Sequence, residues 1–192
     1  MADGTLKVGT ITTSSGSGTI TLGQSGETIA LGSGATLGSG MGKVLQVIQT
    51  VLTTVTSTTS TSHVDISGLS LSITPSSTSS KIFVLVDMAL SESTSNGLVS
   101  WNLVRNSTTL AAGTEAGYST NQTGAVISEL GTAGNGLLKQ STQYLDSPST
   151  TSATTYKIQW RTSAGSTVYL NRRATDTYMS VSSMITAMEI AG

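Results

Sequence analysis

The one histidine in the sequence is the natural place to look for nucleophilic catalysis. His63 follows Ser62 and stands two residues before Asp65. Serine, histidine and aspartate form catalytic triads, but consecutive side chains of an extended strand point to opposite faces. These neighbours therefore do not predict a triad, and we expect His63 to be a strand-end or turn residue.

Glycoside hydrolysis would require two carboxylates that face each other across a cleft. The ten acidic residues are scattered along the chain. Those that could converge in principle are Glu115, Glu129, Asp146 and Asp176, yet nothing in their spacing brings them together. The sequence thus predicts no catalytic residue, and we expect a protein that is not an enzyme.

Metal and cofactor sites have equally little support. Asp3, Asp65 and Asp87 do not follow the spacing of a calcium loop. The chain has no cysteine, which excludes disulfides and sulfur-bound zinc, and its glycine-rich phrases lack the lysine of a phosphate loop. We expect no cofactor and no metal. If three chains associate, as argued below, the sequence does not decide whether an ion lies on their common axis.

Recognition chemistry is better represented, in two polar loops. The longest polar loop carries Tyr118, Asn121 and Gln122, and the last connection between expected strands carries Arg172, Arg173 and Asp176. Loops positioned by a rigid scaffold commonly hold binding residues, and hydrogen-bonding groups beside an aromatic face suit a glycan or a protein surface. These six residues are our candidate receptor-binding residues.

Charge and hydropathy exclude two classes of partner. Only 10% of the residues are charged, the net charge is −1 and the sequence pI is about 5.7. Such a chain lacks the basic patch that binds a phosphate backbone, so we expect no nucleic-acid partner. The longest run of large apolar residues, Ile82 to Val86, is far too short to span a membrane. We also expect no secretory signal, because the first residues include an acid and no apolar core.

The elements that position these loops are expected to be strands. Serine, threonine and glycine are poor helix formers, no stretch keeps a period of 3.6, and valine, isoleucine and threonine favour strands. The expected strands cover 43–55, 63–74, 81–90, 98–105, 108–111, 125–130, 137–145, 156–162, 167–171 and 180–190. This number and spacing suit an antiparallel two-sheet sandwich, most simply a jelly roll.

Apolar periodicity assigns roles to particular strands. Trp101 and Trp160 alternate in phase with aliphatic neighbours, which predicts that both belong to the core. The strand 81–90 is nearly continuously apolar, as expected of a central strand that is covered on both faces. Ala164 and Gly165 are predicted to form a hairpin turn between the strands on either side.

The first forty residues repeat a short glycine-threonine phrase. Its apolar anchors Ile11, Ile20, Ile29 and Leu37 are spaced 9, 9 and 8 residues apart, which indicates a stack of similar units. Nine extended residues cover roughly 30 Å, too little for one chain to wrap a filled three-sided coil. We therefore expect three chains to intertwine, with these anchors as trimer-axis core residues. A glycine cluster then separates a stalk or anchoring segment, 1–42, from a head domain, 43–192.

Several stretches together resemble a known family. These are 66–82, 156–159 with 166–172, and 184–190, and they resemble the head domains of tailed-phage virion fibre proteins. The opening GTIT phrases are similar to the N-terminal segments of phage fibres, especially those of marine and cyanobacterial phages. The resemblance implies a homotrimer on the virion surface. Its N-terminus would anchor to other virion structural proteins, and its head would bind a glycan or protein of the host surface.

Two other functions stay open at this point. The short repeat also suits a decoration or cement protein that stabilises the capsid, with residues 1–42 as an arm on neighbouring subunits. A third hypothesis, an ice-binding or adhesin-like solenoid, draws on the pairs Thr10/Thr12 and Thr19/Thr21. A regular ligand lattice needs more rungs than the four phrases present, which makes this the weakest of the three.

Overall fold

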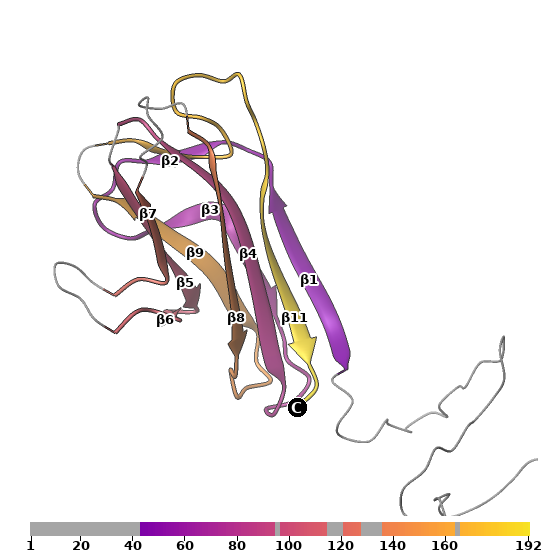
Figure 1. Ribbon diagram of the computed structural model, residues 1–192. Coiled ribbons are helices and arrows are strands. Elements are labelled where there is room, and N and C mark those ends of the chain that lie inside the picture. Colours follow the sequence, from indigo (N-terminus) through magenta and orange to yellow (C-terminus); the bar gives the residue numbers. More distant parts are fainter. Residues whose placement is uncertain (1–42, 95–96, 115–120, 128–135, 164–165) are drawn as a thin grey trace, which may run out of the picture. The chain divides into compact units, whose positions relative to one another are not determined.

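The computed structural model describes residues 43–94, 97–114, 121–127, 136–163 and 166–192 (Figure 1). The predicted trimer-axis residues Ile11, Ile20, Ile29 and Leu37 lie outside these ranges, as does the loop residue Tyr118. The predicted division into 1–42 and 43–192 therefore stays a prediction. Within the described part, the regular structure consists of strands and includes no helix, so the expected all-β class is confirmed.

The strands form two antiparallel sheets. Sheet A contains β1 (Val44–Leu52), β2 (Thr56–Thr58), β4 (Lys81–Glu92), β8 (Leu138–Asp146), β10 (Val168–Leu170) and β11 (Ser183–Ile190). Sheet B contains β3 (Val64–Ile73), β5 (Leu98–Arg105), β6 (Thr108–Leu110), β7 (Gly124–Ile127) and β9 (Thr154–Thr162). The two sheets share one hydrophobic core, an arrangement consistent with a β-sandwich.

In each sheet, two strands pair one after the other with the same side of a longer strand. Val84 of β4 pairs with Tyr144 of β8 on one side and with Ala187 of β11 on the other. Further along β4, β10 takes over the edge that β11 leaves, pairing with Leu90 to Glu92. In sheet B, β6 and β7 likewise succeed each other along one edge of β5. Each sheet is therefore about four strands wide. The described part nevertheless contains more strands than the sequence predicted.

The core lies between the sheets, and on several strands buried and more exposed side chains alternate. Leu69, Leu71 and Ile73 of β3 are buried while the serines between them are exposed. Trp101 and Trp160 are 4% and 2% exposed, which confirms that both tryptophans belong to the core. Burial of these side chains is the main stabilising term, because their apolar surface leaves water on folding.

The strand β4 does not match the expectation of cover on both faces. Ile82, Val84 and Val86 are buried, but the alternate side chains Phe83 and Leu85 are only partly buried. Cover on both faces begins only near Met88. The physical reason is that no second layer of described residues packs on the outer side of sheet A along the first half of β4.

The predicted hairpin around Ala164 and Gly165 is also wrong. These two residues lie outside the described ranges, but β9 pairs within sheet B whereas β10 pairs with β2 and β4 of sheet A. The chain therefore crosses from one sheet to the other at this point. The alternating burial of Val168 and Leu170 is the same whichever sheet receives them, so the pattern did not reveal the partner.

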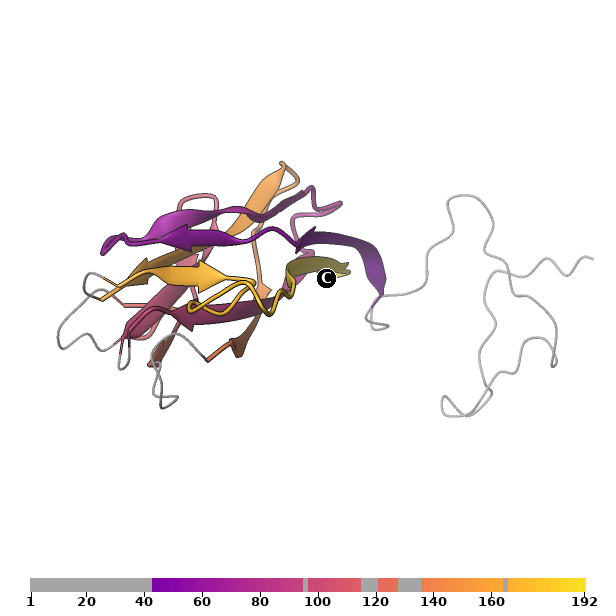
Figure 2. The ribbon, with the colours of Figure 1, turned by 90° about the horizontal axis from the view of Figure 1, so that it is seen from above.

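Both described chain ends lie at one end of the head. Val44 pairs with Ile190, and the amide of Ala191 donates to the carbonyl of Lys43 over 2.9 Å. In two views the C-terminus lies beside the start of β1 (Figures 1 and 2). From there β1 runs to Leu52, which pairs with Ser183. We call the end that holds Lys43 the base of the head.

Candidate binding surfaces

A structured loop between β10 and β11 projects at the end opposite the base (Figure 1). We call residues 171–182 the tip loop. Its first residue, Asn171, is fully buried and has a φ of 67°, a left-handed conformation that asparagine tolerates better than most residues. The Asn171 side chain donates to the carbonyls of Leu52 and Thr54 over 2.7 and 3.0 Å. The loop therefore starts from a point that is bonded to the end of β1.

The return of the tip loop is tied to the same point. The Ser183 hydroxyl donates to Asn171 Oδ1 over 2.6 Å and accepts from the amide of Ala89. The amide of Val181 donates to the Asn171 carbonyl over 3.0 Å, and Arg172 forms a β-bridge with Ser180. Hydrogen bonds of this kind hold both ends of the tip loop to β1, β4 and β11. The tip loop is therefore anchored to sheet A.

An ion pair organises the outer part of the tip loop. Arg173 donates through Nε and Nη2 to the two carboxylate oxygens of Asp176, each over 2.6 Å. Asp176 Oδ1 also accepts the amide of Tyr178 over 2.9 Å. These hydrogen bonds, with that from Arg173 first, lower the pKa of Asp176. A bidentate pair fixes the plane of the guanidinium group and presents it in a defined orientation.

Two tyrosines lie against the two arginines. The Arg172 guanidinium carbon is 4.1 Å from the centre of the Tyr169 ring, and that of Arg173 is 5.2 Å from the centre of the Tyr178 ring, both within cation–π distance. Tyr178 is 85% exposed and its neighbour Met179 is 46% exposed. Tyr178 was not among the predicted binding residues, although an aromatic residue in the most charged connection of the head was a usable signal.

The predicted receptor-binding residues are only partly brought together. Arg172, Arg173 and Asp176 share the tip loop. Asn121 is exposed beside β7 in sheet B, and the Gln122 carbonyl accepts the Gly113 amide over 3.1 Å. Asn121 and Gln122 thus lie just before a strand of sheet B, whereas the tip loop joins two strands of sheet A.

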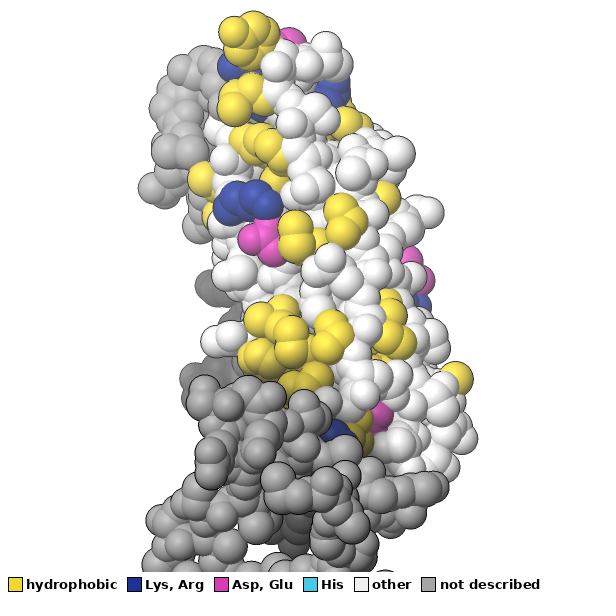
Figure 3. Space-filling model, turned by 90° about the vertical axis from the view of Figure 1, so that its right-hand side faces the viewer, with side chains coloured by type: hydrophobic (Ala, Val, Ile, Leu, Met, Phe, Trp, Pro, Cys, Tyr) yellow, Lys and Arg dark blue, Asp and Glu magenta, His cyan; other side chains and the backbone are white. Residues whose placement is uncertain are grey.

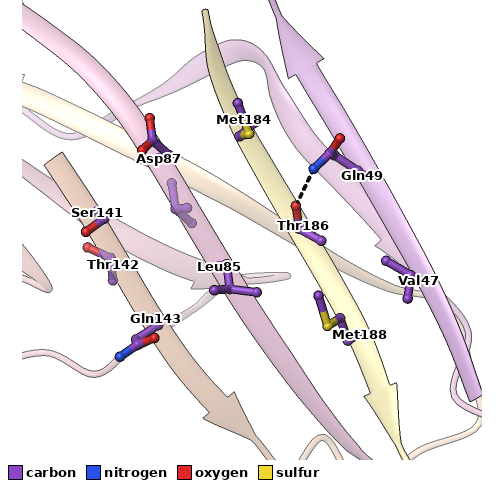
Figure 4. A pocket seen from close by; sticks show the side chains of 11 residues that line it. Val47, Gln49, Leu85, Asp87, Ser141, Thr142, Gln143, Met184, Thr186 and Met188 are labelled. Atoms are coloured by element: carbon purple, nitrogen blue, oxygen red, sulfur yellow. Dashed lines mark hydrogen bonds between the residues drawn. The ribbon is translucent and has the colours of Figure 1, made fainter. Parts of the chain in front are cut away.

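A second surface is formed by the outer face of sheet A. Strand pairing aligns three successive rows across β1, β11, β4 and β8. The rows are Val47–Met188–Phe83–Leu145, Gln49–Thr186–Leu85–Gln143 and Val51–Met184–Asp87–Ser141. We call these twelve residues the outer face of sheet A. A groove of about 610 Å³ runs over it, and Gln49 donates to Thr186 Oγ1 over 2.8 Å in its wall (Figure 4).

The residues considered for catalysis do not form a site in the described part. Asp146 accepts from Arg105 at the base, whereas Asp176 lies in the tip loop at the other end. Glu115 and Glu129 lie outside the described residues. Asp65 accepts from Lys157 and Gln159, each over 2.8 Å, and these bonds lower its pKa. Asp65 is therefore bound within sheet B and is not paired with His63.

His63 itself is half-buried just before β3. Burial, and then the charge of Arg161, lower its pKa, so the neutral imidazole is favoured. Among the described residues no three histidine, aspartate or glutamate side chains come close enough to hold a metal ion. The same part of the chain contains no helix with the length and apolar character of a membrane span.

Comparison with known proteins does not add a relative. No protein-family model matches this sequence, and no curated protein is significantly similar to it. The fold and its surfaces define an all-β head of two antiparallel sheets with a loop at one end and an open sheet face on one side.

Proposed function

We propose that this protein is a non-enzymatic, homotrimeric appendage on the surface of a phage virion. Residues 1–42 form the intertwined stalk and anchor it to other virion structural proteins. Residues 43–192 form a jelly-roll-like head that binds a glycan or protein of the host surface through the tip loop. The observation that carries the proposal is the position of the tip loop at the end of the head opposite Lys43.

This position is what an attachment protein requires. The segment 1–42 joins the head at Lys43, and β1 then runs nine residues to Leu52, beside the start of β11. At about 3.3 Å per residue the strand covers roughly 30 Å. A head held at its base therefore presents the tip loop outward, toward whatever the particle meets.

The chemistry of the tip loop suits a carbohydrate or a polar protein surface. The exposed Tyr178 ring offers an apolar face, and the Arg173–Asp176 pair beside it offers donors and acceptors in fixed directions. Because the pair is already formed, little side-chain freedom is lost when a ligand binds. Three copies in one trimer would raise the strength of weak individual contacts by orders of magnitude.

The test compares two full-length variants. Tyr178→Ala removes the exposed ring of the tip loop, and Ser147→Ala changes an exposed residue just after β8, at the base. We expect Tyr178→Ala to weaken binding of the labelled protein to host cells at least tenfold and Ser147→Ala to leave it unchanged. Equal binding by the wild type and both variants would contradict the role of the tip loop.

The position of the protein on the particle separates the proposal from the capsid-decoration alternative. Full-length protein carrying a label at Met1 should appear at discrete projections of purified virions. Copies distributed over the capsid, together with no binding of the free protein to cells, would favour a decoration or cement protein that stabilises the head shell.

A further inference from the structure

The outer face of sheet A carries a row of apolar side chains that the described residues leave open. Its first row, Val47–Met188–Phe83–Leu145, crosses four strands without a polar side chain. Val47 is 55% exposed and Leu145 is 49% exposed, so both ends of the row reach solvent. Contiguous apolar surface on a folded head commonly marks a contact with another protein.

The strand β1 adds an edge to this face. It is the outermost strand of sheet A beside β11, and it has no charged residue between Val44 and Leu52. Of the nine large hydrophobic side chains exposed in the described part, four are on this strand: Val44, Leu45, Val47 and Val51. Long, uncharged edge strands are prone to associate, and proteins usually protect them with charges or cover.

The charge on the face favours a second copy of this chain as the partner. The only charged side chain of the three rows is Asp87, and Lys139 of β8 forms an ion pair with it. In the space-filling view, apolar side chains gather in patches, with a few basic and acidic side chains between them (Figure 3). Margins without net charge do not repel each other when two copies of the chain meet, whereas a face of one charge sign would repel a second copy.

The way the chain enters the head points to the same partner. The 42 residues before Lys43 lead directly into β1, the strand at the margin of this face. If their regular anchors join three chains, they also hold three β1 strands at short range. Effective concentrations in a tethered assembly are high enough to make a modest apolar contact form.

We propose that the heads of the trimer meet through the two margins of the outer face of sheet A, at β1 and at β8. The inference rests on the proposed function only in taking three copies to associate. A closed three-fold ring requires two different patches to meet. The β1 margin of one copy, with Val47, meets the β8 margin of the next copy, with Leu145. The groove residues between them, such as Leu85 and Met188, turn toward the axis.

Because the chain has no cysteine, this contact can be tested with a disulfide. Val47 and Leu145 of one chain are three strand spacings apart, roughly 14 Å, which is too far for a disulfide within the chain. The full-length double variant Val47→Cys/Leu145→Cys should therefore form covalent dimers and trimers under mild oxidation. Each single variant should stay mostly monomeric on a non-reducing gel. A second control, Val47→Cys/Val64→Cys, places the partner thiol on sheet B and should not cross-link.

The outcomes separate this inference from the proposed function. A trimer by light scattering that gives no cross-link in the double variant would overturn the inference and leave the trimer intact. Cross-linking in the single variant Val47→Cys would mean that the β1 margin meets itself, which also contradicts the proposed ring. A monomeric full-length protein would contradict both.

A second measurement needs no cysteine. Val47→Lys places three positive charges in the contact, whereas Val64→Lys places them on sheet B at a site that is 38% exposed. We expect Val47→Lys to raise the concentration at which trimers dissociate at least tenfold and Val64→Lys to leave it unchanged. Equal dissociation of both variants and the wild type would overturn the inference.

Discussion

The head contains the same three residue types together at each of its two ends. Arg105, Asp146 and Tyr156 meet at the base, and Arg173, Asp176 and Tyr178 meet in the tip loop. At the base the aspartate side chain is 5% exposed and the tyrosine is fully buried. At the tip the corresponding values are 44% and 85%.

The difference in burial separates a structural role at the base from the proposed binding role at the tip. The Tyr156 hydroxyl donates to Asp146 Oδ2, and Arg105 Nη1 donates to both Asp146 oxygens. These bonds join β8 of sheet A to β5 and β9 of sheet B. Burial and the Asp146 hydrogen bond raise the pKa of Tyr156 far above its ordinary value, so this hydroxyl stays a donor. Arg173, Asp176 and Tyr178 all lie in the tip loop and do not join the two sheets. Their polar groups remain accessible to a ligand.

The largest effect on stability is expected at the base. Asp146→Ala leaves the Arg105 guanidinium and the buried Tyr156 hydroxyl without their acceptor. Loss of one partner of a buried charged network costs about 3 kcal/mol. Urea unfolding of the full chain should show this loss, and Asp176→Ala is the matched variant at the tip. Equal losses for both would remove the distinction between the two ends.

A second carboxylate near the base should make stability depend on acid. Glu189 is fully buried, which by itself raises its pKa, but hydrogen bonds from Ser76 and Gln46 outweigh burial and lower the pKa to about 2. Because the folded pKa lies below the ordinary value of about 4.3, the stabilisation is complete above that value and is lost as pH falls toward 2.

Thermal unfolding between pH 5 and pH 2, roughly the span of that titration, would measure this dependence. We expect Glu189→Gln to flatten the fall in stability, because the amide does not titrate. Asp176→Asn should leave the fall almost unchanged, since the tip carboxylate is largely exposed. A wild-type protein with no loss of stability over this range would contradict the assignment to Glu189.

The smallest effect is expected in the tip loop. Arg173→Ala breaks the bidentate pair with Asp176, but exposed ion pairs contribute little to folding. We expect the urea midpoint to stay within error of the wild type while binding to host cells weakens. Arg105→Ala is the matched change at the base and should lower the midpoint clearly. A large loss of stability in Arg173→Ala would make the tip pair structural.

Alternation in the sequence predicted most strands. Trp101 on β5 and Trp160 on β9 were assigned correctly to the core, because apolar residues that alternate along a strand lie on one face of the sheet. The three-residue strand β2 was missed, because Thr-Ser-Thr carries no apolar signal. The hairpin after β9 was wrong, because local alternation does not say which sheet accepts the next strand.

The candidate site shows the same division. Arg172, Arg173 and Asp176 were predicted to share the last connection between strands, and they lie in the tip loop. Asn121 and Gln122 were predicted in a separate polar loop, and they lie beside sheet B. The exposure of Tyr178 depends on the direction in which the loop leaves the sheets, and no spacing in the sequence records that direction.

The sequence by itself determined the class of the fold and the burial of its two tryptophans. These follow from local periodicity and residue type. Only the tertiary structure decided that β4 is open on its outer side, that Asp146 joins Arg105 and Tyr156, and that the tip loop stands opposite Lys43. Each of these depends on strands that are far apart in sequence, and long-range pairing sets which side chains meet and which are left in solvent.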